Sequence, residues 1–252
     1  IFFFLSIILN ARRVELQQSN FDNFSKDWWD EKGPMKMLHS MNQTRMLFIK
    51  ERISNRYETL GDFKDVIKKK KILDLGCGGG ILSEALAKEG ARIKAIDTSF
   101  KLIKEAKKRA ASKDYNISYE NCDINKIFKR KEKFDIIISL EVIEHVSDIN
   151  AFLNTTFNCL NKNGLIIFST INRSLISYFS TIFLAEKILG LVPKNTHDWK
   201  SYVKPKEIIL VAKKFNIKLD KVEGLFPIPL ISGIDWIRIK NVKANYILSL
   251  KN

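Results

Sequence analysis

The chain has 252 residues and a formal net charge of +15, from 43 Lys and Arg against 28 Asp and Glu. Hydrophobic residues make up 45% and charged residues 28%, a balance that excludes a disordered or a membrane-embedded chain. The positive charge is typical of a protein that meets nucleic acid or an anionic membrane, and a plain surface preference for lysine gives the same balance. Three widely separated cysteines predict neither disulfides nor a zinc site and favour a reducing compartment.

The first residues carry no interpretable targeting signal. Residues 1–9 are apolar, but they are fewer than the roughly 20 residues that cross a bilayer, and they lack the basic leader and cleavage site of a signal peptide. Residues 1–20 are therefore left as an uncertain segment, and 21–252 are predicted to form a single domain. Within it, 21–66 are expected to form a helical cap, with helices over 22–33 and 39–57.

From residue 71 onward, short apolar runs alternate with helical stretches. The pattern predicts strands over 72–75, 93–96, 117–119, 134–139, 165–169, 219–222 and 246–250. It predicts helices over 81–89, 99–111, 148–160 and 205–215. Strands that alternate with helices favour right-handed crossovers and an α/β fold with a doubly wound, mostly parallel sheet, here seven-stranded and Rossmann-like. Ligands of such sheets bind at the carboxyl ends of the strands.

A glycine-rich turn follows the first strand. Gly76 and Gly78 lead into two further glycines and a helix, so that backbone N–H groups can approach a nucleotide-like ligand closely. The dinucleotide fingerprint G-x-G-x-x-G fails in both frames, because its last position falls on Ile81 or on Ser83. Asp74 lies two residues before the first glycine, where a carboxylate attracts an amine or a sulfonium. The pattern D-x-G-x-G-x-G resembles the first motif of class I methyltransferases, which implies S-adenosylmethionine as the cofactor.

Two more aspartates follow the next strands. Asp97 closes the second strand, 21 residues after Gly76, which places an acceptor where ribose hydroxyls would lie. Asp123 follows the third strand and either accepts from the adenine amino group or is an ordinary loop aspartate.

The fourth strand ends in a cluster of ionisable side chains. In a helical turn, Glu141, Glu144 and His145 would fall at i, i+3 and i+4 and share one face. Such a group can hold a divalent ion or deprotonate a hydroxyl. The alternative is a hydrogen-bonded cluster that supports the cofactor loop.

Residues 174–192 form a long apolar stretch in which only Glu186 and Lys187 are charged. Such a segment is too apolar for an exposed surface helix. In a basic protein it can enter the headgroup region of an anionic membrane. A buried core helix or a dimer face is the alternative.

Several motifs together are similar to the ubiquinone biosynthesis O-methyltransferase family, from about Phe21 to the C-terminus. Besides the glycine loop, they occupy residues 27–30, 38–42 with Arg45, 141–146, 169–173 and 192–198. The family methylates phenolic hydroxyls of polyprenylated benzene rings at two steps of the quinone pathway. The resemblance thus implies that the acceptors are 2-polyprenyl-6-hydroxyphenol and 3-demethylubiquinol.

The resemblance also implies roles for individual residues. Arg45, Gly76, Asp97 and Leu140 would contact S-adenosylmethionine, with Leu140 standing where some members have Met. Mg²⁺ would be associated with the cluster from Glu141 to His145. The insertion at 174–198 would meet membrane lipid and substrate. The protein would then work from the cytoplasm on the inner membrane, or on the matrix face in a mitochondrion, and other ubiquinone biosynthesis enzymes are candidate partners.

The expected chemistry is attack of a phenolate on the sulfonium methyl group, so the protein must align the reactants and generate the phenolate. Either a metal at the cluster lowers the pKa of the phenol, or His145 takes the proton as a general base. Three alternative functions remain. The first is methylation of another small phenol or acid, and the second is a cofactor-binding scaffold without catalysis. The third is an RNA-binding or RNA-modifying protein, but the sequence does not interleave aromatic with basic residues, so no nucleic-acid partner is expected.

Overall fold

The computed structural model describes residues 22–57, 62–177, 199–230 and 233–252. Its strands are β1 (Lys71–Leu75), β2 (Arg92–Asp97), β3 (Ile117–Asn121), β4 (Phe134–Leu140), β5 (Leu160–Ile171), β6 (Lys218–Leu230), β7 (Gly233–Ile239) and β8 (Asn245–Lys251). They form one sheet in the order β3-β2-β1-β4-β5-β8-β6-β7. Neighbours from β3 to β5 are parallel, and the pairs that involve β8, β6 and β7 are antiparallel. The predicted α/β class with a mostly parallel sheet is confirmed.

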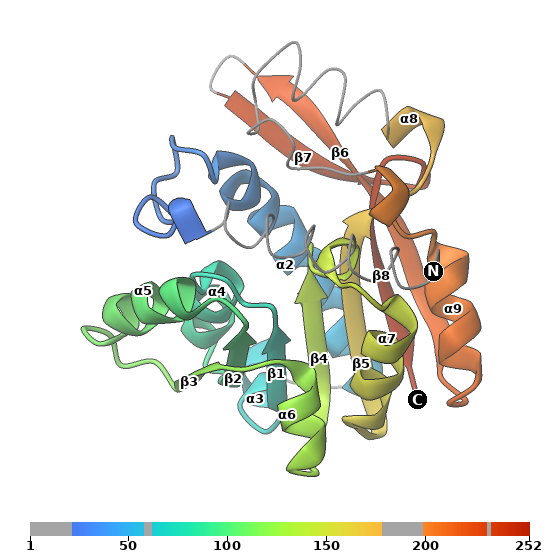
Figure 1. Cartoon of the computed structure of the whole chain (residues 1–252), viewed down its shortest axis with the longest axis horizontal. Coiled ribbons are helices and arrows are strands. Elements are labelled where there is room, and N and C mark those ends of the chain that lie inside the picture. Colours follow the sequence, from blue (N-terminus) through green and yellow to red (C-terminus); the bar gives the residue numbers. More distant parts are fainter. Residues whose placement is uncertain (1–21, 58–61, 178–198, 231–232) are drawn as a thin grey trace, which may run out of the picture.

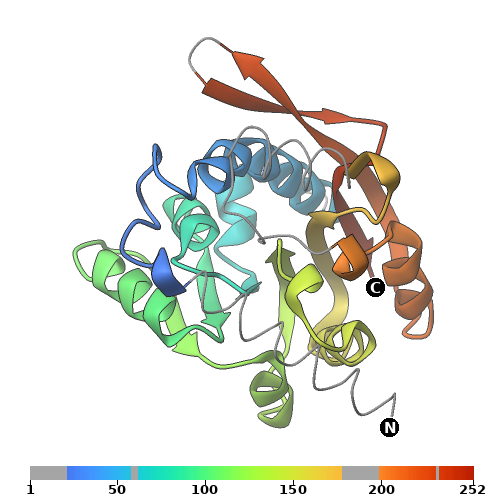
Figure 2. The ribbon, with the colours of Figure 1, turned by 45° about the horizontal axis from the view of Figure 1, so that its top comes forward.

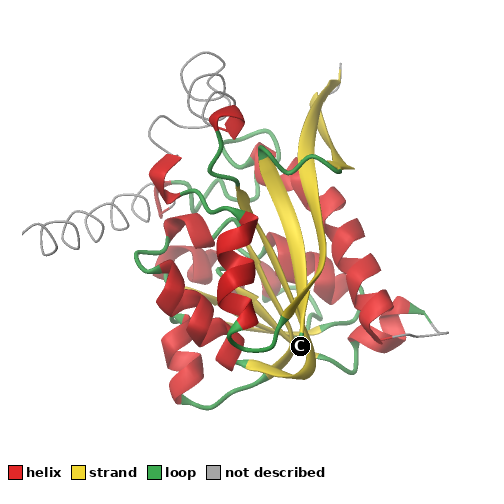
Figure 3. Cartoon of the chain, turned by 90° about the vertical axis from the view of Figure 1, so that its right-hand side faces the viewer, coloured by secondary structure: helices red, strands yellow, loops and turns green. Residues whose placement is uncertain are grey.

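Helices cover both faces of this sheet (Figure 3). The helices are α2 (Lys36–Tyr57), α3 (Phe63–Ile67), α4 (Ile81–Lys88), α5 (Phe100–Ala110), α6 (Ile124–Lys129), α7 (Ile149–Asn158), α8 (Leu175–Ser177) and α9 (Pro205–Lys213), with 3₁₀ turns η1 (Ile143–His145) and η3 (Trp199–Ser201). One core joins the sheet to α2, α3, α4 and α5, and a second joins it to α6, α7 and α9. Alternate strand residues enter opposite cores, as the pleat requires: Ile72 enters the first core and Leu73 the second.

Side-chain caps start α5, α6 and α7, whereas α4 begins at Gly80 without one. The hydroxyl of Ser99 accepts from the backbone N–H of Leu102 at 3.1 Å and begins α5. The carboxylates of Asp123 and Asp148 begin α6 and α7 in the same way. Each cap satisfies a backbone donor that the helix leaves open. These caps fix the turns at the carboxyl edge of the sheet, where the glycine loop also lies.

The helix predicted over 22–33 is wrong. Only residues 22 and 23 are helical, and 24–33 are a series of turns, in which the N–H groups of Asp27, Asp30 and Gly33 donate to the carbonyl three residues earlier. Contacts with the rest of the fold override local propensity: the indole of Trp29 donates to the Gly79 carbonyl at 2.9 Å. The second predicted helix is present as α2 and begins three residues earlier than expected, at Lys36.

The predicted strand number is also corrected, because the described sheet has eight strands. The missed strand is β7, which forms a hairpin with an unexpectedly long β6 and extends above α2 (Figure 1). Pro227 and Pro229 lie where β6 pairs with β7 alone, beyond the stretch that pairs with β8. Proline, which lacks an N–H, is tolerated at such a one-sided position, but it obscures the strand in the sequence.

Of the apolar stretch 174–192, only its beginning lies within the described residues, where α8 exposes Leu175 and Ile176. Residues 178–198 lie outside them. Among the helices that are described, none has both the length and the apolar character needed to cross a membrane.

Candidate active site

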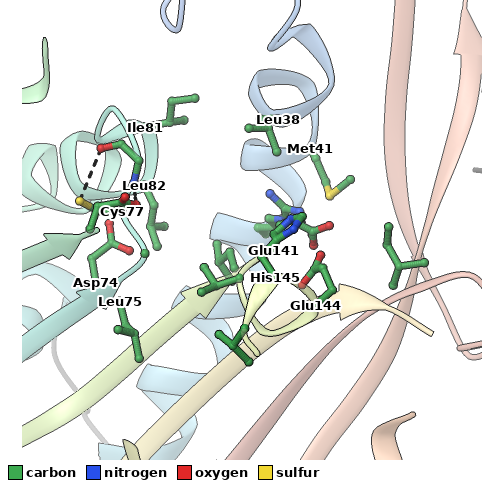
Figure 4. Close-up of a pocket in the computed structure, with 18 of the residues that line it drawn as sticks. Leu38, Met41, Asp74, Leu75, Cys77, Ile81, Leu82, Glu141, Glu144 and His145 are labelled. Atoms are coloured by element: carbon green, nitrogen blue, oxygen red, sulfur yellow. Dashed lines mark hydrogen bonds and ion pairs between the residues drawn. The ribbon is translucent and has the colours of Figure 1, made fainter. Parts of the chain in front are cut away.

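A cavity of about 900 Å³ lies at the carboxyl ends of the parallel strands. All the predicted site residues line it: Arg45, Asp74, Gly76, Gly78, Asp97, Asp123, Leu140, Glu141, Glu144 and His145. They come from α2, the glycine loop and the ends of β2, β3 and β4. Figure 4 shows the three ionisable residues after β4 grouped together, with Asp74 and Cys77 to one side. The fold therefore brings together side chains that the sequence placed on separate segments.

The glycine loop is held tightly against its neighbours. Gly76 and Gly78 have φ angles of +79° and +53°, which a residue with a side chain rarely adopts. The N–H groups of Gly76 and Cys77 both donate to the Ile96 carbonyl, at 2.8 and 3.0 Å. A Cβ atom at Gly76 would lie 2.3 Å from Val142, and one at Gly78 would lie 2.5 Å from the Trp28 ring. Both positions therefore require glycine.

Asp97 ties the glycine loop to the start of α5. One carboxylate oxygen accepts from the Gly78 N–H and the other from the Ser99 N–H, both at 2.8 Å. Each oxygen keeps a further lone pair for a ligand hydroxyl. Burial raises the pKa of Asp97, against the effect of these hydrogen bonds. The carboxylate is thus positioned by the loop that it also organises.

Asp74 lies beneath the loop, 2% exposed, and accepts from the Ser83 hydroxyl at 2.5 Å. Burial is the main cause that raises its pKa from 3.8 to about 7, and the negative charge of Asp97 adds to the effect. A carboxyl group in this setting gains from a cationic ligand, because the ligand would supply the missing countercharge.

The raised pKa of Asp74 predicts a pH-dependent stability. Between pH 4 and about 7 the folded protein holds this proton and the unfolded chain releases it, so stability falls as pH rises through that window. We expect Asp74→Asn to stabilise the ligand-free protein. The gain in the free energy of unfolding should grow by about 1.4 kcal/mol per pH unit from pH 5 to 7 and then level off. Urea unfolding at pH 5, 6, 7 and 8 measures this. The control is Asp114→Asn, at an exposed position. A difference in stability between Asp74→Asn and the wild type that does not change with pH would contradict the prediction.

Arg45 is buried at the centre of the site. Its Nη2 lies 2.8 Å from Oε1 of Glu141, and the side chain is 4% exposed. Burial lowers the pKa of Arg45, and the carboxylates of Glu141 and Glu144 oppose this. Its Nε donates to no acceptor among the described residues. A buried donor without an acceptor is costly, so an anionic ligand group such as a carboxylate fits here.

Glu141 and Glu144 are bound by the last residues of β5. Oε1 of Glu141 accepts from the Ser169 hydroxyl, and Oε2 of Glu144 accepts from the Thr170 hydroxyl, both at 2.8 Å. Asn245 on β8 also donates to Glu141, at 3.3 Å. Burial, followed by the charge of Glu141, raises the pKa of Glu144 to about 8.

The expected helical turn does not begin at Glu141. This residue has a φ of +56°, and the 3₁₀ turn η1 starts only at Ile143. A left-handed conformation in a residue other than glycine is a strained feature that its surroundings must hold in place. Here the N–H of Glu141 donates to the Ser169 carbonyl at 2.9 Å. The three residues still share one cavity, because the turn redirects the chain rather than continuing it as a helix.

The predicted Mg²⁺ site does not fit this arrangement. Both oxygens of Glu141 already accept hydrogen bonds, and one of them also pairs with Arg45. Across the part of the chain that is described, no group of three His, Cys, Asp or Glu side chains is placed to hold a metal ion. No step below depends on a metal, and the metal role stays a prediction.

The other two predicted contacts are placed as follows. Leu140 ends β4 and presents an apolar side chain to the cavity. Asp123 lines the cavity but also caps α6, where it accepts from the Lys126 N–H at 3.0 Å. Asp123 therefore has a structural role as the cap of α6, and its contact with adenine stays a prediction.

Sequence reasoning missed the segment that covers the glycine loop. Trp28 packs on Gly78 and Gly79, and its carbonyl lies 2.8 Å from Nε2 of His39. The guanidinium of Arg109 lies 3.6 Å from the centre of the Trp29 ring. The Trp28-Trp29 pair stood out in the sequence, but nothing local indicated that it would reach the loop some 50 residues later.

Comparison with known proteins places this geometry in a class. A family model described as a methyltransferase domain matches residues 43–222. Magnesium protoporphyrin IX methyltransferase from Synechocystis PCC 6803, solved with bound SAH, has a TM-score of 0.63 and 17% identity over 96% of this chain and 98% of that one. The PH0226 protein of Pyrococcus horikoshii OT3 has a TM-score of 0.58 and 17% identity over 88% and 93% of the two chains. The fold, the glycine loop and Asp97 define a class I S-adenosylmethionine-dependent methyltransferase.

Curated relatives narrow the class to a family. The ubiquinone biosynthesis O-methyltransferase of Pelagibacter ubique (strain HTCC1062) is 39% identical over 95% of this chain and 96% of its own length. Its counterpart in Bartonella quintana (strain Toulouse) is 35% identical, over 97% and 99% of the two chains. The protein from Coxiella burnetii (strain RSA 331 / Henzerling II) is 36% identical, over 95% and 97%. The chain belongs to the ubiquinone biosynthesis O-methyltransferase family.

Proposed function

We propose that this protein methylates phenolic hydroxyls of polyprenylated ring intermediates in ubiquinone biosynthesis, 2-polyprenyl-6-hydroxyphenol and 3-demethylubiquinol. The observation that carries the proposal is the single cavity that joins the glycine loop to Arg45, Glu141 and His145 in a chain that matches ubiquinone biosynthesis O-methyltransferases along nearly its whole length. The cofactor and the phenol can therefore bind next to each other in the same cavity.

S-adenosylmethionine, when bound, supplies a methyl group on a positively charged sulfur. Asp97 would accept from its ribose hydroxyls, and Asp74 would favour its positive charge. Arg45 would hold its carboxylate, and Glu141 keeps the guanidinium in place through their ion pair. These residues would orient the donor toward the part of the cavity lined by His145.

His145 is the candidate for the proton transfer. It is partly buried, lines the cavity, and is held in place by the turn η1, where its N–H donates to the Val142 carbonyl at 2.9 Å. In the proposed step it accepts the phenol proton while the oxygen–carbon bond forms and the sulfur–carbon bond breaks. Glu141 and Glu144 would support this side of the cavity through their contacts with Ser169 and Thr170.

A methyl-transfer assay tests the function. The wild-type protein should transfer a labelled methyl group to a prenylated catechol, and His145→Ala should lower kcat by about 10²-fold or more. The reaction is run with and without EDTA. Activity that is lost with EDTA and restored by Mg²⁺ would overturn the general-base version, and tight cofactor binding without any transfer would overturn the function. The control is Asp114→Ala, since Asp114 is exposed and lies outside the cavity lining.

We also propose that the protein works on the cytoplasmic surface of an anionic inner membrane, or on the matrix face in a mitochondrion, through residues 174–192. Support comes from the net charge of +15 and from the exposure of Leu175 and Ile176, 72% and 49%. We expect sedimentation with phosphatidylglycerol vesicles to exceed that with phosphatidylcholine vesicles, and Leu175→Ser with Ile176→Ser to reduce it. Equal sedimentation of the wild type with both would contradict this. Pull-down of other ubiquinone biosynthesis enzymes from such membranes tests whether they are partners.

A further inference from the structure

The cavity continues past the ionisable cluster into a second arm between α2 and the β6–β7 hairpin. Figure 2 shows these two elements on the same side of the molecule. The walls of this arm, called here the tail arm, are Met37, Met41, Leu225, Pro227, Ile234 and Trp236. The carboxyl ends of β1 and β2, which carry Asp74 and Asp97, lie at the other end of the cavity, because β4, β5 and β8 separate them from the hairpin. The tail arm is therefore separate from Asp74 and Asp97, and Arg45 lies between the two regions.

The α2 wall of the tail arm is rich in methionine. The chain has four methionines, and two of them, Met37 and Met41, line the cavity from α2. Methionine is flexible and polarisable, and it adapts to irregular apolar ligands without a fixed shape. Among the described residues that line the cavity from α2 and the hairpin, Arg45 at the inner end of the arm is charged, Asn42 carries an amide, and the others are apolar. A polar or charged ligand would gain nothing there.

The hairpin wall is fixed in place. Opposite residues in the β6–β7 pairing share a face, so Pro227 with Trp236 and Pro229 with Ile234 lie on one side. The Trp236 indole donates to the Ser40 hydroxyl at 3.0 Å, and the Thr44 hydroxyl donates to the Trp236 carbonyl at 2.8 Å. Both partners lie on α2. The two walls are thus bound to each other, and the arm is a built feature rather than a gap between loosely packed elements.

We propose that the tail arm binds the isoprenoid chain of the methyl acceptor, with the phenolic ring beside Glu141, Glu144 and His145. This inference rests on the proposed function. An uncharged, flexible hydrocarbon suits the apolar, methionine-lined walls, whereas the polar ring suits the cluster. The chemistry of the two halves of the substrate matches the chemistry of the two regions of the cavity. Selection of the substrate by its tail would then reside in Met37, Met41, Ile234 and Trp236.

The test fills the arm and uses a matched control on the same strand. Ile234→Trp adds bulk inside the arm, and Ile237→Trp adds the same bulk on the opposite face, where Ile237 is 40% exposed and pairs with Phe226. Met37→Trp, inside the arm, and Leu47→Trp, at a position that is 57% exposed, form a second pair on α2. For each variant, kcat/KM is measured with a farnesylated catechol and with catechol that lacks the tail. Binding of farnesol to the protein loaded with S-adenosylhomocysteine is measured by calorimetry.

We expect the ratio of kcat/KM for the farnesylated to the tail-free phenol to fall by about tenfold or more in Ile234→Trp and Met37→Trp. Farnesol binding should weaken to match, and both controls should stay near the wild type. Equal losses for both phenols, or equal effects of Ile234→Trp and Ile237→Trp, would overturn the proposal. If the wild type binds farnesol in a way that Ile234→Trp blocks but methylates neither phenol, the tail arm stands and the proposed function fails. If the wild type methylates both phenols equally and binds no farnesol, methyl transfer to phenols stands and the tail arm fails.

Discussion

Replacing Asp97 by alanine is expected to weaken S-adenosylmethionine binding by about 100-fold or more, since hydrogen bonds to a charged group contribute about 1.5–3 kcal/mol each. The variant loses the acceptor for the ribose hydroxyls. It also frees the N–H groups of Gly78 and Ser99, which the carboxylate now holds at 2.8 Å each. The loop and the start of α5 would then no longer be fixed before the ligand arrives.

Calorimetric titration with S-adenosylhomocysteine measures this effect. Asp97→Asn keeps one acceptor and should lose less affinity than alanine does. Asp62→Ala is the control, because Asp62 caps α3 and does not line the cavity. Asp123→Ala separates the two roles of that residue: a loss close to that of Asp97→Ala would indicate contact with adenine, whereas a small loss would indicate capping alone. Unchanged affinity in Asp97→Ala would remove Asp97 from the cofactor site.

Replacing Arg45 by methionine is expected to destabilise the protein by about 3–5 kcal/mol, the usual result of breaking a buried ion pair from one side. Glu141 would keep its charge beside the buried Glu144, and among the described residues Arg45 is the cation that pairs with it. Cofactor affinity should fall as well, because the buried Nε is the donor left open for an anionic group.

The double variant Arg45→Met with Glu141→Gln separates the two effects. Removing both charges should restore much of the stability, because no unpaired charge remains in the ion pair, but it should not restore cofactor binding. Urea unfolding and titration with S-adenosylhomocysteine are measured on the single and double variants. Glu51→Gln is the control, since Glu51 is paired with Arg52 and Arg238 at a more exposed position. Losses of stability that simply add in the double variant would show that Arg45 and Glu141 do not act as a pair.

The local parts of the site could be read from the sequence because they depend on neighbouring residues. A strand followed by glycines at positions 76 and 78 defines its own turn, and the observed φ values are those that glycine permits. Asp97 falls at the end of a parallel strand next to β1, so its distance from the loop follows from the sheet. The caps at Ser99 and Asp123 follow from the same local chemistry.

The errors arose where a distant contact decides the conformation. Residues 24–33 form turns because Trp28 and Trp29 pack on the glycine loop. Glu141 adopts a left-handed conformation because β5 holds it through Ser169. The hairpin of β6 and β7 is not evident from the sequence, because two prolines in β6 argue against a strand there. The one-sided pairing of this part of β6 tolerates them.

The sequence by itself determined the fold class, the cofactor loop and the family, because strand periodicity, glycine spacing and capping residues act over a few neighbouring positions. Only the tertiary structure decided which charges meet. It paired Arg45 with Glu141, and it buried Asp74 and Glu144 enough to raise both pKa values. It also placed Trp236 against α2 to form an apolar arm beside the polar cluster. Burial and pairing depend on segments up to 196 residues apart, and no local pattern specifies them.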